Sequence, residues 1–153
     1  MSRAFVKETD EVARLGERPV SQHPNYVTPE GRAQIEGEVK RLSQAFAAAQ
    51  ARGDRDAVVS IGRDLRYWVQ RLATAQTIAG SSDNAEVRFG STVTIVRKDG
   101  RRQTWRIVGE DEAHPASGTI SYVSPLARAL AGKKVGDCIS LKDTNVEIIA
   151  IVR

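Results

Sequence analysis

The apolar residues in the first half of the chain recur at helical spacing in two consecutive segments. In the first segment, alternating steps of four and three residues join Ile35, Val39, Leu42, Phe46 and Ala49. In the second, steps of three and four join Val58, Ile61, Leu65, Trp68, Leu72 and Ala75. Each series forms a narrow apolar seam along one side of a helix. Because a short polar turn separates the seams, residues 28–79 are predicted to form an antiparallel helical hairpin of the coiled-coil type.

Local signals indicate where both helices begin and end. Residues 28–30 read Thr-Pro-Glu, which combines a hydroxyl N-cap, a proline at the first helical position and an acid in the first turn. Gly53 suits the position after a helix, and either Asp54 or Asp56 can cap the next helix by accepting its free N–H groups. With roughly 24 residues in each helix, the hairpin is a rod roughly 35 Å long, and residues 51–57 form its tip.

The second half of the chain changes to the alternating pattern of strands. We expect strands, in chain order, at residues 87–89, 92–98, 104–108, 119–123, 138–141 and 146–152. Asp99-Gly100 is a hairpin turn signal, and Pro125 starts a short helix over residues 126–131. A core is expected from Val93, Ile95, Trp105, Ile107, Leu130, Ile139 and Ile149. The predicted fold class is α+β, with a helical hairpin followed by a small, mostly antiparallel sheet and one helix.

Two segments lie outside these elements. Residues 1–27 mix charges with glycine and proline and show no sustained period, so we expect a mobile arm without assigned structure. A short recognition motif around Arg3, Phe5 and Lys7 is the alternative. Residues 80–86 are small and polar, as in a linker. The expected organisation is therefore an arm (1–27), a hairpin (28–79), a linker (80–86) and a sheet domain (87–153).

Composition narrows the functional class only modestly. The chain has 153 residues, of which 41% are hydrophobic, so a core can form without disulfides. Its one cysteine, Cys138, is expected to be buried in a strand, and no intrachain disulfide can form. No apolar leader or membrane-length run occurs, so we expect a cytoplasmic protein that does not bind membranes. The net charge of +4 favours acidic partners slightly, although solubility explains it equally well.

Several motifs of the second half resemble the C-terminal domain of the GreA/GreB family of transcript cleavage factors, in order and in spacing. They are Phe89-Gly90-Ser91-Thr92-Val93, Ile107-Val108-Gly109, Ile120-Ser121, Ser124-Pro125-Leu126-Ala127-Arg128-Ala129-Leu130 and Gly132-Lys133-Lys134-Val135-Gly136-Asp137. Thr28-Pro29-Glu30-Gly31 resembles the start of that family's helical hairpin. The resemblance implies an FKBP-like fold for residues 87–153, which is not evidence of prolyl isomerase activity. It also implies a hairpin that enters the secondary channel of bacterial RNA polymerase.

The resemblance also supplies a hypothesis about the hairpin tip. In cleaving family members, acidic tip residues help to hold an Mg²⁺ ion that is shared with the polymerase active centre. The family pattern is a Gly-Asp pair with a second acid three residues later. Asp54 matches the first acid, and we regard it as the metal candidate, but the second position is Ala57. Asp56 is one residue away, yet Arg52 and Arg55 oppose a cation. The alternative is that these carboxylates only cap a helix.

The hairpin also looks shorter than in cleaving members, by roughly eight residues per helix, or about 12 Å. The family's docking segment, which binds a coiled-coil element at the rim of the channel, is better matched. It reads Ser121-Tyr122-Val123-Ser124-Pro125 here, and our docking candidates are Ser121, Val123, Ser124 and Pro125. A proline and small hydroxyls give a rigid surface with a low ordering cost. The family often has an acid or amide at the position of Val123, and Ser124-Pro125 is also a helix N-cap signal.

The sequence therefore predicts a bacterial RNA polymerase-binding elongation factor, not an enzyme in its own right, with little or no stimulation of transcript cleavage. The alternatives are an adaptor similar to the regulator of nucleoside diphosphate kinase, and a non-cleaving competitor of the cleavage factors. Arg63, Arg66 and Arg71 fit a face that contacts RNA or polymerase, and equally a solvated helix face. Two histidines are too few for a zinc site, no cofactor of its own is expected, and we expect a monomer.

Overall fold

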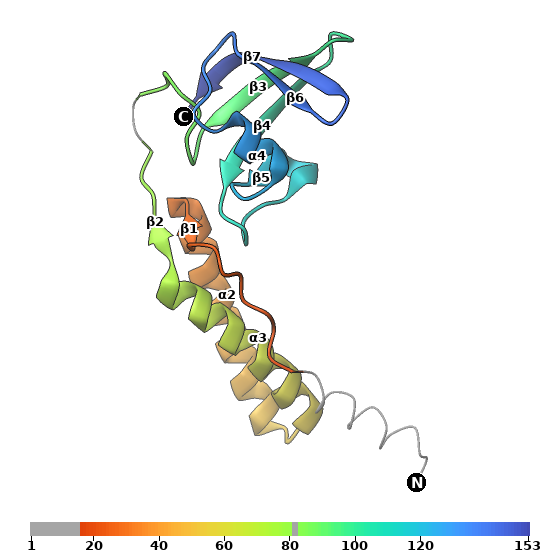
Figure 1. Ribbon diagram of the computed structural model, residues 1–153. Helices are drawn as coiled ribbons and strands as arrows, with labels where there is room; N and C mark the ends of the chain where they lie inside the picture. The colour runs from red at the N-terminus through yellow and green to blue at the C-terminus, as the bar shows by residue number, and fades with distance from the viewer. Residues whose placement is uncertain (1–15, 81–82) are drawn as a thin grey trace. The chain divides into compact units, whose positions relative to one another are not determined.

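The computed structural model describes residues 16–80 and 83–153, and the chain divides into two compact units (Figure 1). The first unit contains residues 33–75 and, among the described residues before them, 16–22. The second unit contains residues 23–32 and 76–153. The segment just before the first long helix, together with that helix's first turn, therefore belongs with the sheet and not with the hairpin.

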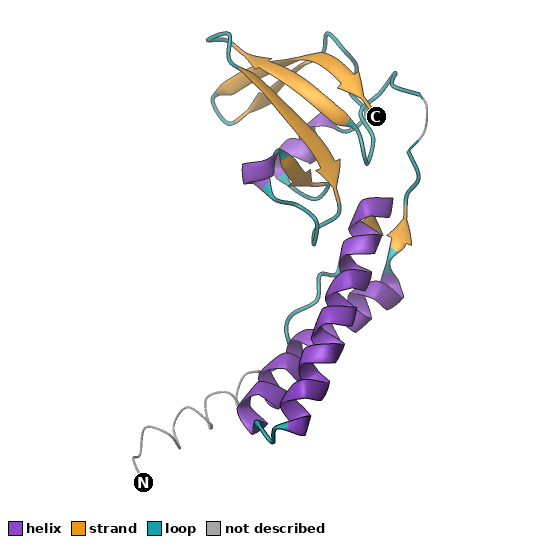
Figure 2. Ribbon diagram, turned by 180° about the vertical axis from the view of Figure 1, so that it is seen from behind, coloured by secondary structure: helices purple, strands orange, loops and turns teal. Residues whose placement is uncertain are grey.

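The first unit is the predicted helical hairpin. Helices α2 (Pro29–Ala51) and α3 (Arg55–Thr74) lie side by side in Figures 1 and 2. Gly53 makes the turn between them with a φ of 68°, a left-handed conformation that glycine adopts without a Cβ penalty. Where the helices pack, a Cβ on Gly62 would lie 3.2 Å from the ring of Phe46, so any larger residue there would require the ring to move by a few tenths of an ångström. The hairpin is confirmed, although its second helix ends at Thr74.

The first described residues pack against α3. Arg66 donates to Glu17 at 2.6 Å, and Arg18 donates to Asp64 at 3.3 Å. The guanidinium of Arg18 also lies 4.0 Å from the ring centre of Tyr67, a cation–π arrangement. Of the arm expected at residues 1–27, residues 1–15 lie outside the described residues. Within the described part of the arm, Glu17 and Arg18 form ion pairs with α3. This part of the arm therefore has fixed contacts, which the sequence did not predict.

The second unit contains a five-stranded sheet in the order β5-β4-β3-β7-β6, whose strands are labelled in Figure 1. Neighbouring strands are antiparallel except for β4 and β5, which are parallel. The strands are β3 (Thr92–Arg97), β4 (Arg102–Val108), β5 (Thr119–Ser121), β6 (Cys138–Leu141) and β7 (Thr144–Val152). Strand β5 is preceded by a short 3-10 helix, η1 (Pro115–Ser117), and followed by helix α4 (Pro125–Leu130). The predicted α+β class, with a helical hairpin and a small sheet domain, is confirmed.

The core of the sheet agrees with the predicted alternation except in β7. Val93, Ile95, Ile107, Leu130 and Ile139 are buried as expected, and Trp105 packs against them partly buried. The pairing of β3 with β7 shifts register after Thr94, which leaves Ile149 as the extra residue of a bulge. Because the extra residue resets the alternation, the buried side chains are Val146 and Ile148 before the bulge and Ile151 after it, and Ile149 is only partly buried. Cys138, expected to be buried, is exposed, because it alternates with the buried Ile139.

Two further differences concern short pairings. The expected strand at residues 87–89 is absent; instead, Val87 exchanges backbone hydrogen bonds with Gly132 and Lys133, after α4. Two strands of two residues each, β1 (Tyr26–Val27) and β2 (Gln76–Thr77), form a separate parallel pair that the pattern did not predict. Such short strands carry no detectable period, because alternation needs about four residues to appear.

Candidate functional site

The segment that the sequence nominates for docking, Ser121–Pro125, joins β5 to α4. Local hydrogen bonds fix its backbone: Tyr122 N–H donates to the Val108 carbonyl at 2.9 Å, and Ser124 N–H donates to the Ser121 carbonyl at 2.9 Å. The Ser121 hydroxyl accepts from Val123 N–H at 3.2 Å. The Ser124 hydroxyl accepts from an N–H of α4 at 3.2 Å, so the N-cap interpretation is confirmed. Pro125 is exposed at the start of the helix.

An aromatic cluster lies beside this segment. The ring centres of Tyr26 and Tyr122 are 5.3 Å apart, those of Phe89 and Tyr122 are 5.7 Å apart, and those of Tyr26 and Phe89 are 6.2 Å apart. These separations and the steep angles between the rings are favourable for aromatic pairs. Sequence reasoning missed this cluster, because its members come from three distant segments and share no period.

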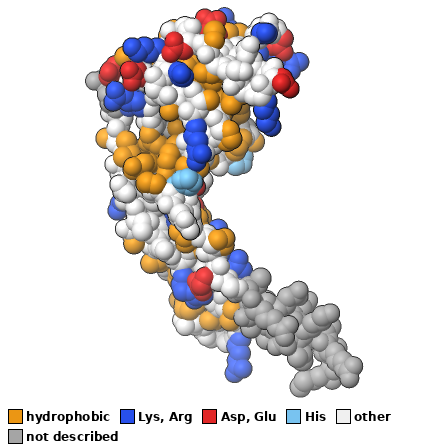
Figure 3. Space-filling model, in the orientation of Figure 1, with side chains coloured by type: hydrophobic (Ala, Val, Ile, Leu, Met, Phe, Trp, Pro, Cys, Tyr) orange, Lys and Arg blue, Asp and Glu red, His pale blue; other side chains and the backbone are white. Residues whose placement is uncertain are grey.

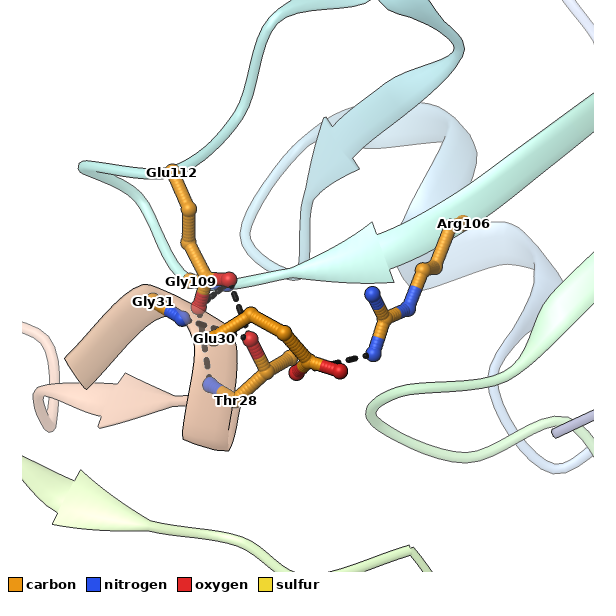
Figure 4. Close-up of polar contacts among 6 residues, drawn as sticks. All are labelled: Thr28, Glu30, Gly31, Arg106, Gly109 and Glu112. Atoms are coloured by element: carbon orange, nitrogen blue, oxygen red, sulfur yellow. Dashed lines mark hydrogen bonds and ion pairs between the residues drawn. The ribbon is translucent and has the colours of Figure 1, made fainter. Parts of the chain in front are cut away.

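A polar network in the same unit joins the start of α2 to the loop after β4 (Figure 4). The Glu112 carboxylate accepts from Thr28 N–H at 2.8 Å and from Gly109 N–H at 3.1 Å, and the Thr28 hydroxyl donates to it as well. The same hydroxyl accepts from Gly31 N–H at 3.0 Å, which confirms Thr28 as the N-cap of α2. Thr28 is buried, and both its N–H and its hydroxyl have hydrogen-bond partners, as buried polar groups require.

An ion pair lies at the edge of this network. Arg106 of β4 donates to Glu30 at 3.4 Å (Figure 4). The pKa of Glu30 lies below its ordinary value, mainly because its own backbone N–H donates to the carboxylate and secondly because Arg106 is near. The Glu30 side chain is 63% exposed, so this ion pair contributes only modestly beside the buried contact of Thr28 with Glu112.

At the hairpin tip, Asp54 is engaged as a helix cap. One carboxylate oxygen accepts from Ala57 N–H at 3.1 Å, and the other lies 3.5 Å from Arg52 Nε. Asp56 lies within the first turn of α3. Within residues 16–80 and 83–153, no group of three or more acidic, histidine or cysteine side chains could hold a metal ion. The capping interpretation of Asp54 is confirmed, and the geometry does not assemble a metal site from this chain alone.

The three arginines of α3 that the sequence singles out, Arg63, Arg66 and Arg71, do not form one exposed stripe. Arg66 is paired with Glu17, Arg71 is only 2% exposed, and Arg63 is half-buried. On the face of the sheet-bearing unit seen in Figure 3, basic and acidic side chains are interspersed. Neither surface therefore offers a continuous basic track of the kind that nucleic-acid backbones favour.

Comparison with known proteins identifies the family. Residues 82–153 match the family described as "Transcription elongation factor, GreA/GreB, C-term". The chain is 34% identical to transcription elongation factor GreA of Chloroflexus aurantiacus, over 80% of this chain and 90% of that protein. It is 33% identical to GreA of Ruegeria pomeroyi, over 82% and 95% respectively. The chain belongs to the GreA/GreB family of transcription elongation factors.

Solved structures with looser similarity include two GreA/GreB relatives. GreA factor homolog 1 (Gfh1) of Thermus thermophilus is 20% identical, with a TM-score of 0.40 over 86% of this chain and 100% of that one. The GreA/GreB factor of Nitrosomonas europaea is also 20% identical, with a TM-score of 0.43 over 84% and 99%.

Factors of the GreA/GreB family are accessory factors rather than enzymes, in agreement with the expectation for this chain. Across the described residues, the structure contains no helix with the length and apolarity to span a membrane.

Proposed function

We propose that this GreA/GreB factor binds bacterial RNA polymerase through Ser121–Pro125, at the rim of the secondary channel. The observation that carries the proposal is the rigidity of this segment, whose backbone and two serine hydroxyls are held by hydrogen bonds while Pro125 stays exposed. A pre-ordered segment with small side chains binds a helical partner at a low entropic cost. The family resemblance supplies the partner, and the geometry supports the segment as the contact.

For the hairpin tip, we propose a role without strong stimulation of cleavage. Both oxygens of Asp54 already have partners in the chain, and Ala57 occupies the position of the second acid. The residues at the tip therefore do not fit an Mg²⁺ site of their own, and any share in the polymerase's ion would require Oδ2 of Asp54 to exchange its contact with Arg52 for the metal. The helices have 23 and 20 residues, which is short of the roughly 24 that the sequence suggested. A docked factor of this kind acts by occupying the site that cleaving relatives use.

A binding assay with matched proline variants tests the docking contact. Pro125→Arg should weaken binding to purified bacterial core RNA polymerase by at least about tenfold, because a long charged side chain would replace a flat exposed ring at the centre of the contact. Pro115→Arg is the control, since Pro115 is also an exposed proline at the first position of a short helix in the same unit. Equal affinities for the two folded variants would remove Ser121–Pro125 from the contact.

A competition assay tests the mode of action. Backtracked polymerase is incubated with a cleaving GreA protein and increasing amounts of this factor, and shortened RNA is measured. We expect cleavage to fall as this factor is added, and Pro125→Arg to abolish that effect. Strong cleavage by this factor alone would contradict the proposed role of the tip. Recovery of nucleoside diphosphate kinase without polymerase subunits in a pull-down would favour the adaptor function instead.

A further inference from the structure

Residues 23–28, the segment before α2, contact the docking segment from a distant part of the sequence. We infer that this N-terminal strap, residues 23–28, positions Ser121–Pro125 for its partner, and that Tyr26 and Tyr122 are the positioning residues. The inference deepens the proposed function and rests on it for the identity of the partner. It concerns only contacts inside the second unit, to which both segments belong.

Tyr122 lies within the docking segment and makes two kinds of contact with the strap. Its ring packs on Tyr26, at 5.3 Å between centres, and Phe89 completes the cluster at 5.7 Å from Tyr122. Its hydroxyl donates a hydrogen bond to the Pro24 carbonyl. The Pro24 carbonyl also accepts from Tyr26 N–H at 3.0 Å, so one acceptor fixes both tyrosines. Tyr122 is thus held from the strap side while Pro125 is exposed to solvent.

The strap can hold Tyr122 because other residues, which are not part of the docking segment, fix the strap in place. Gln76 N–H donates to the Asn25 carbonyl at 2.8 Å, and Ile78 N–H donates to the Val27 carbonyl at 2.9 Å, within the β1–β2 pair. At the end of the strap, Thr28 binds the Glu112 carboxylate with both its N–H and its hydroxyl. Val27 and Thr28 are each 1% exposed. A segment anchored in this way forms a fixed surface against which Tyr122 can pack.

The physical consequence is a higher population of the binding-competent docking segment. A ligand that binds only one conformation has an apparent affinity reduced by the fraction of molecules in that conformation. The segment 121–125 is a short connection between β5 and α4, and without Tyr26 its tyrosine would lose its principal strap-side ring contact. We therefore expect removal of the Tyr26 ring to weaken partner binding without removing any group that touches the partner.

The test combines amide hydrogen exchange by NMR on the free factor with affinity for core RNA polymerase. Tyr26→Ala should raise the exchange rates of the Tyr122, Val123 and Ser124 amides by about tenfold. It should also raise the dissociation constant for polymerase by about tenfold, which is the size of effect expected when favourable ring pairs are lost. Tyr26→Phe keeps the ring and should behave as wild type in both measurements. Tyr122→Phe removes only the hydroxyl and should change both by about two- to fivefold.

Two results would overturn the inference. Unchanged exchange of those three amides in Tyr26→Ala would show that the strap does not hold the segment. Faster exchange with unchanged polymerase affinity would show that holding the segment is irrelevant to binding. If Tyr26→Ala fails to unfold cooperatively, Tyr122→Phe decides by the same two measurements. Failure of the proposed function gives a different result, in which wild type and Pro125→Arg bind polymerase equally or not at all while the exchange data still report on the strap.

Discussion

The Glu112 carboxylate binds the backbone N–H and the hydroxyl of Thr28, which lies 84 positions earlier in the chain. The same carboxylate accepts from Gly109 N–H, so one side chain satisfies donors from the start of α2 and from the loop after β4. A Cβ on Gly109 would lie 2.3 Å from the Tyr26 carbonyl oxygen, which shows how closely the strap passes this loop. Glu112 is therefore a polar anchor of the strap, and its removal should affect stability.

Glu112→Ala should lower the free energy of unfolding by about 1–3 kcal/mol, because the N–H groups of the buried Thr28 and of Gly109 lose their acceptor. Glu112→Gln keeps one acceptor oxygen and should fall between wild type and the alanine variant. Urea unfolding at equilibrium measures both, and Glu147→Ala, on the exposed side of β7, is the control that should change stability by less than about 0.5 kcal/mol. Equal effects of Glu112→Ala and Glu147→Ala would contradict this role.

Two glycines of α2 should respond to alanine with opposite signs. A Cβ on Gly31 would lie 2.2 Å from the Glu112 carboxyl carbon, whereas a Cβ on Gly37 would have no other atom within 4 Å. Gly37→Ala should stabilise the protein by about 0.5–1 kcal/mol, because glycine is costly inside a helix. Gly31→Ala should destabilise it by about 1–3 kcal/mol, because the hydrogen-bonded carboxylate has to move.

The same urea experiment on the double variant Gly31→Ala, Glu112→Ala separates the clash from the helix propensity. Since the alanine at position 112 removes the obstructing carboxylate, the two changes should cost less together than the sum of their single costs. Additive costs, or a stabilising Gly31→Ala, would show that the clash is relieved in another way.

The sequence predicts those features of the structure that depend on residues a few positions apart, and it misses those that depend on residues far apart in the chain. The caps at Thr28, Asp54 and Ser124 are predictable, because each side chain binds an N–H three residues along the chain. The helical seams follow from local spacing in the same way. These local features predict the hairpin and most strands of the sheet.

The features that sequence reasoning missed are non-local. The partner of Thr28 is Glu112, and nothing in the residues around either one indicates the other. The same holds for Tyr122 and the Pro24 carbonyl, which are 98 positions apart. The bulge at Ile149 is determined by the pairing of β7 with β3, so the alternation within β7 could not reveal it. The family resemblance indicates the candidate docking residues. The contacts that support their conformation come from distant segments, so only the folded structure reveals them.

The ion pair of Glu17 with Arg66 predicts a pH dependence with a definite sign. The hydrogen bond from Arg66, followed by the charges of Arg66 and Arg63, holds the pKa of Glu17 below its ordinary value. Because the folded-state pKa is the lower one, the contact contributes fully above the unfolded-state pKa and is lost as pH falls through the folded-state value. A carboxyl NMR titration should therefore find Glu17 ionised at pH values where an unpaired glutamate is already protonated.

Arg66→Gln should return the Glu17 titration to its ordinary range. Glu38 is the internal control, since its pKa is lowered chiefly by its own hydrogen bond with Arg41 and should not respond to this variant. Both pairs are exposed, so added salt should reduce both shifts. An unchanged Glu17 titration in Arg66→Gln would show that the pairing is not maintained in solution.

The tip carboxylates give opposite outcomes under their two interpretations. Asparagine caps helices nearly as well as aspartate, so Asp54→Asn and Asp56→Asn should leave the free energy of unfolding nearly unchanged, while Asp54→Ala should lower it by about 1 kcal/mol. If Asp54 instead contributes to Mg²⁺ binding, Asp54→Asn should abolish cleavage stimulation while polymerase binding persists. Since Asp54 is engaged by Ala57 N–H and Arg52, we expect wild type to stimulate little or no cleavage on a backtracked complex. Strong cleavage by wild type that disappears in Asp54→Asn would show that the Asp54 carboxylate contributes to the polymerase's metal site.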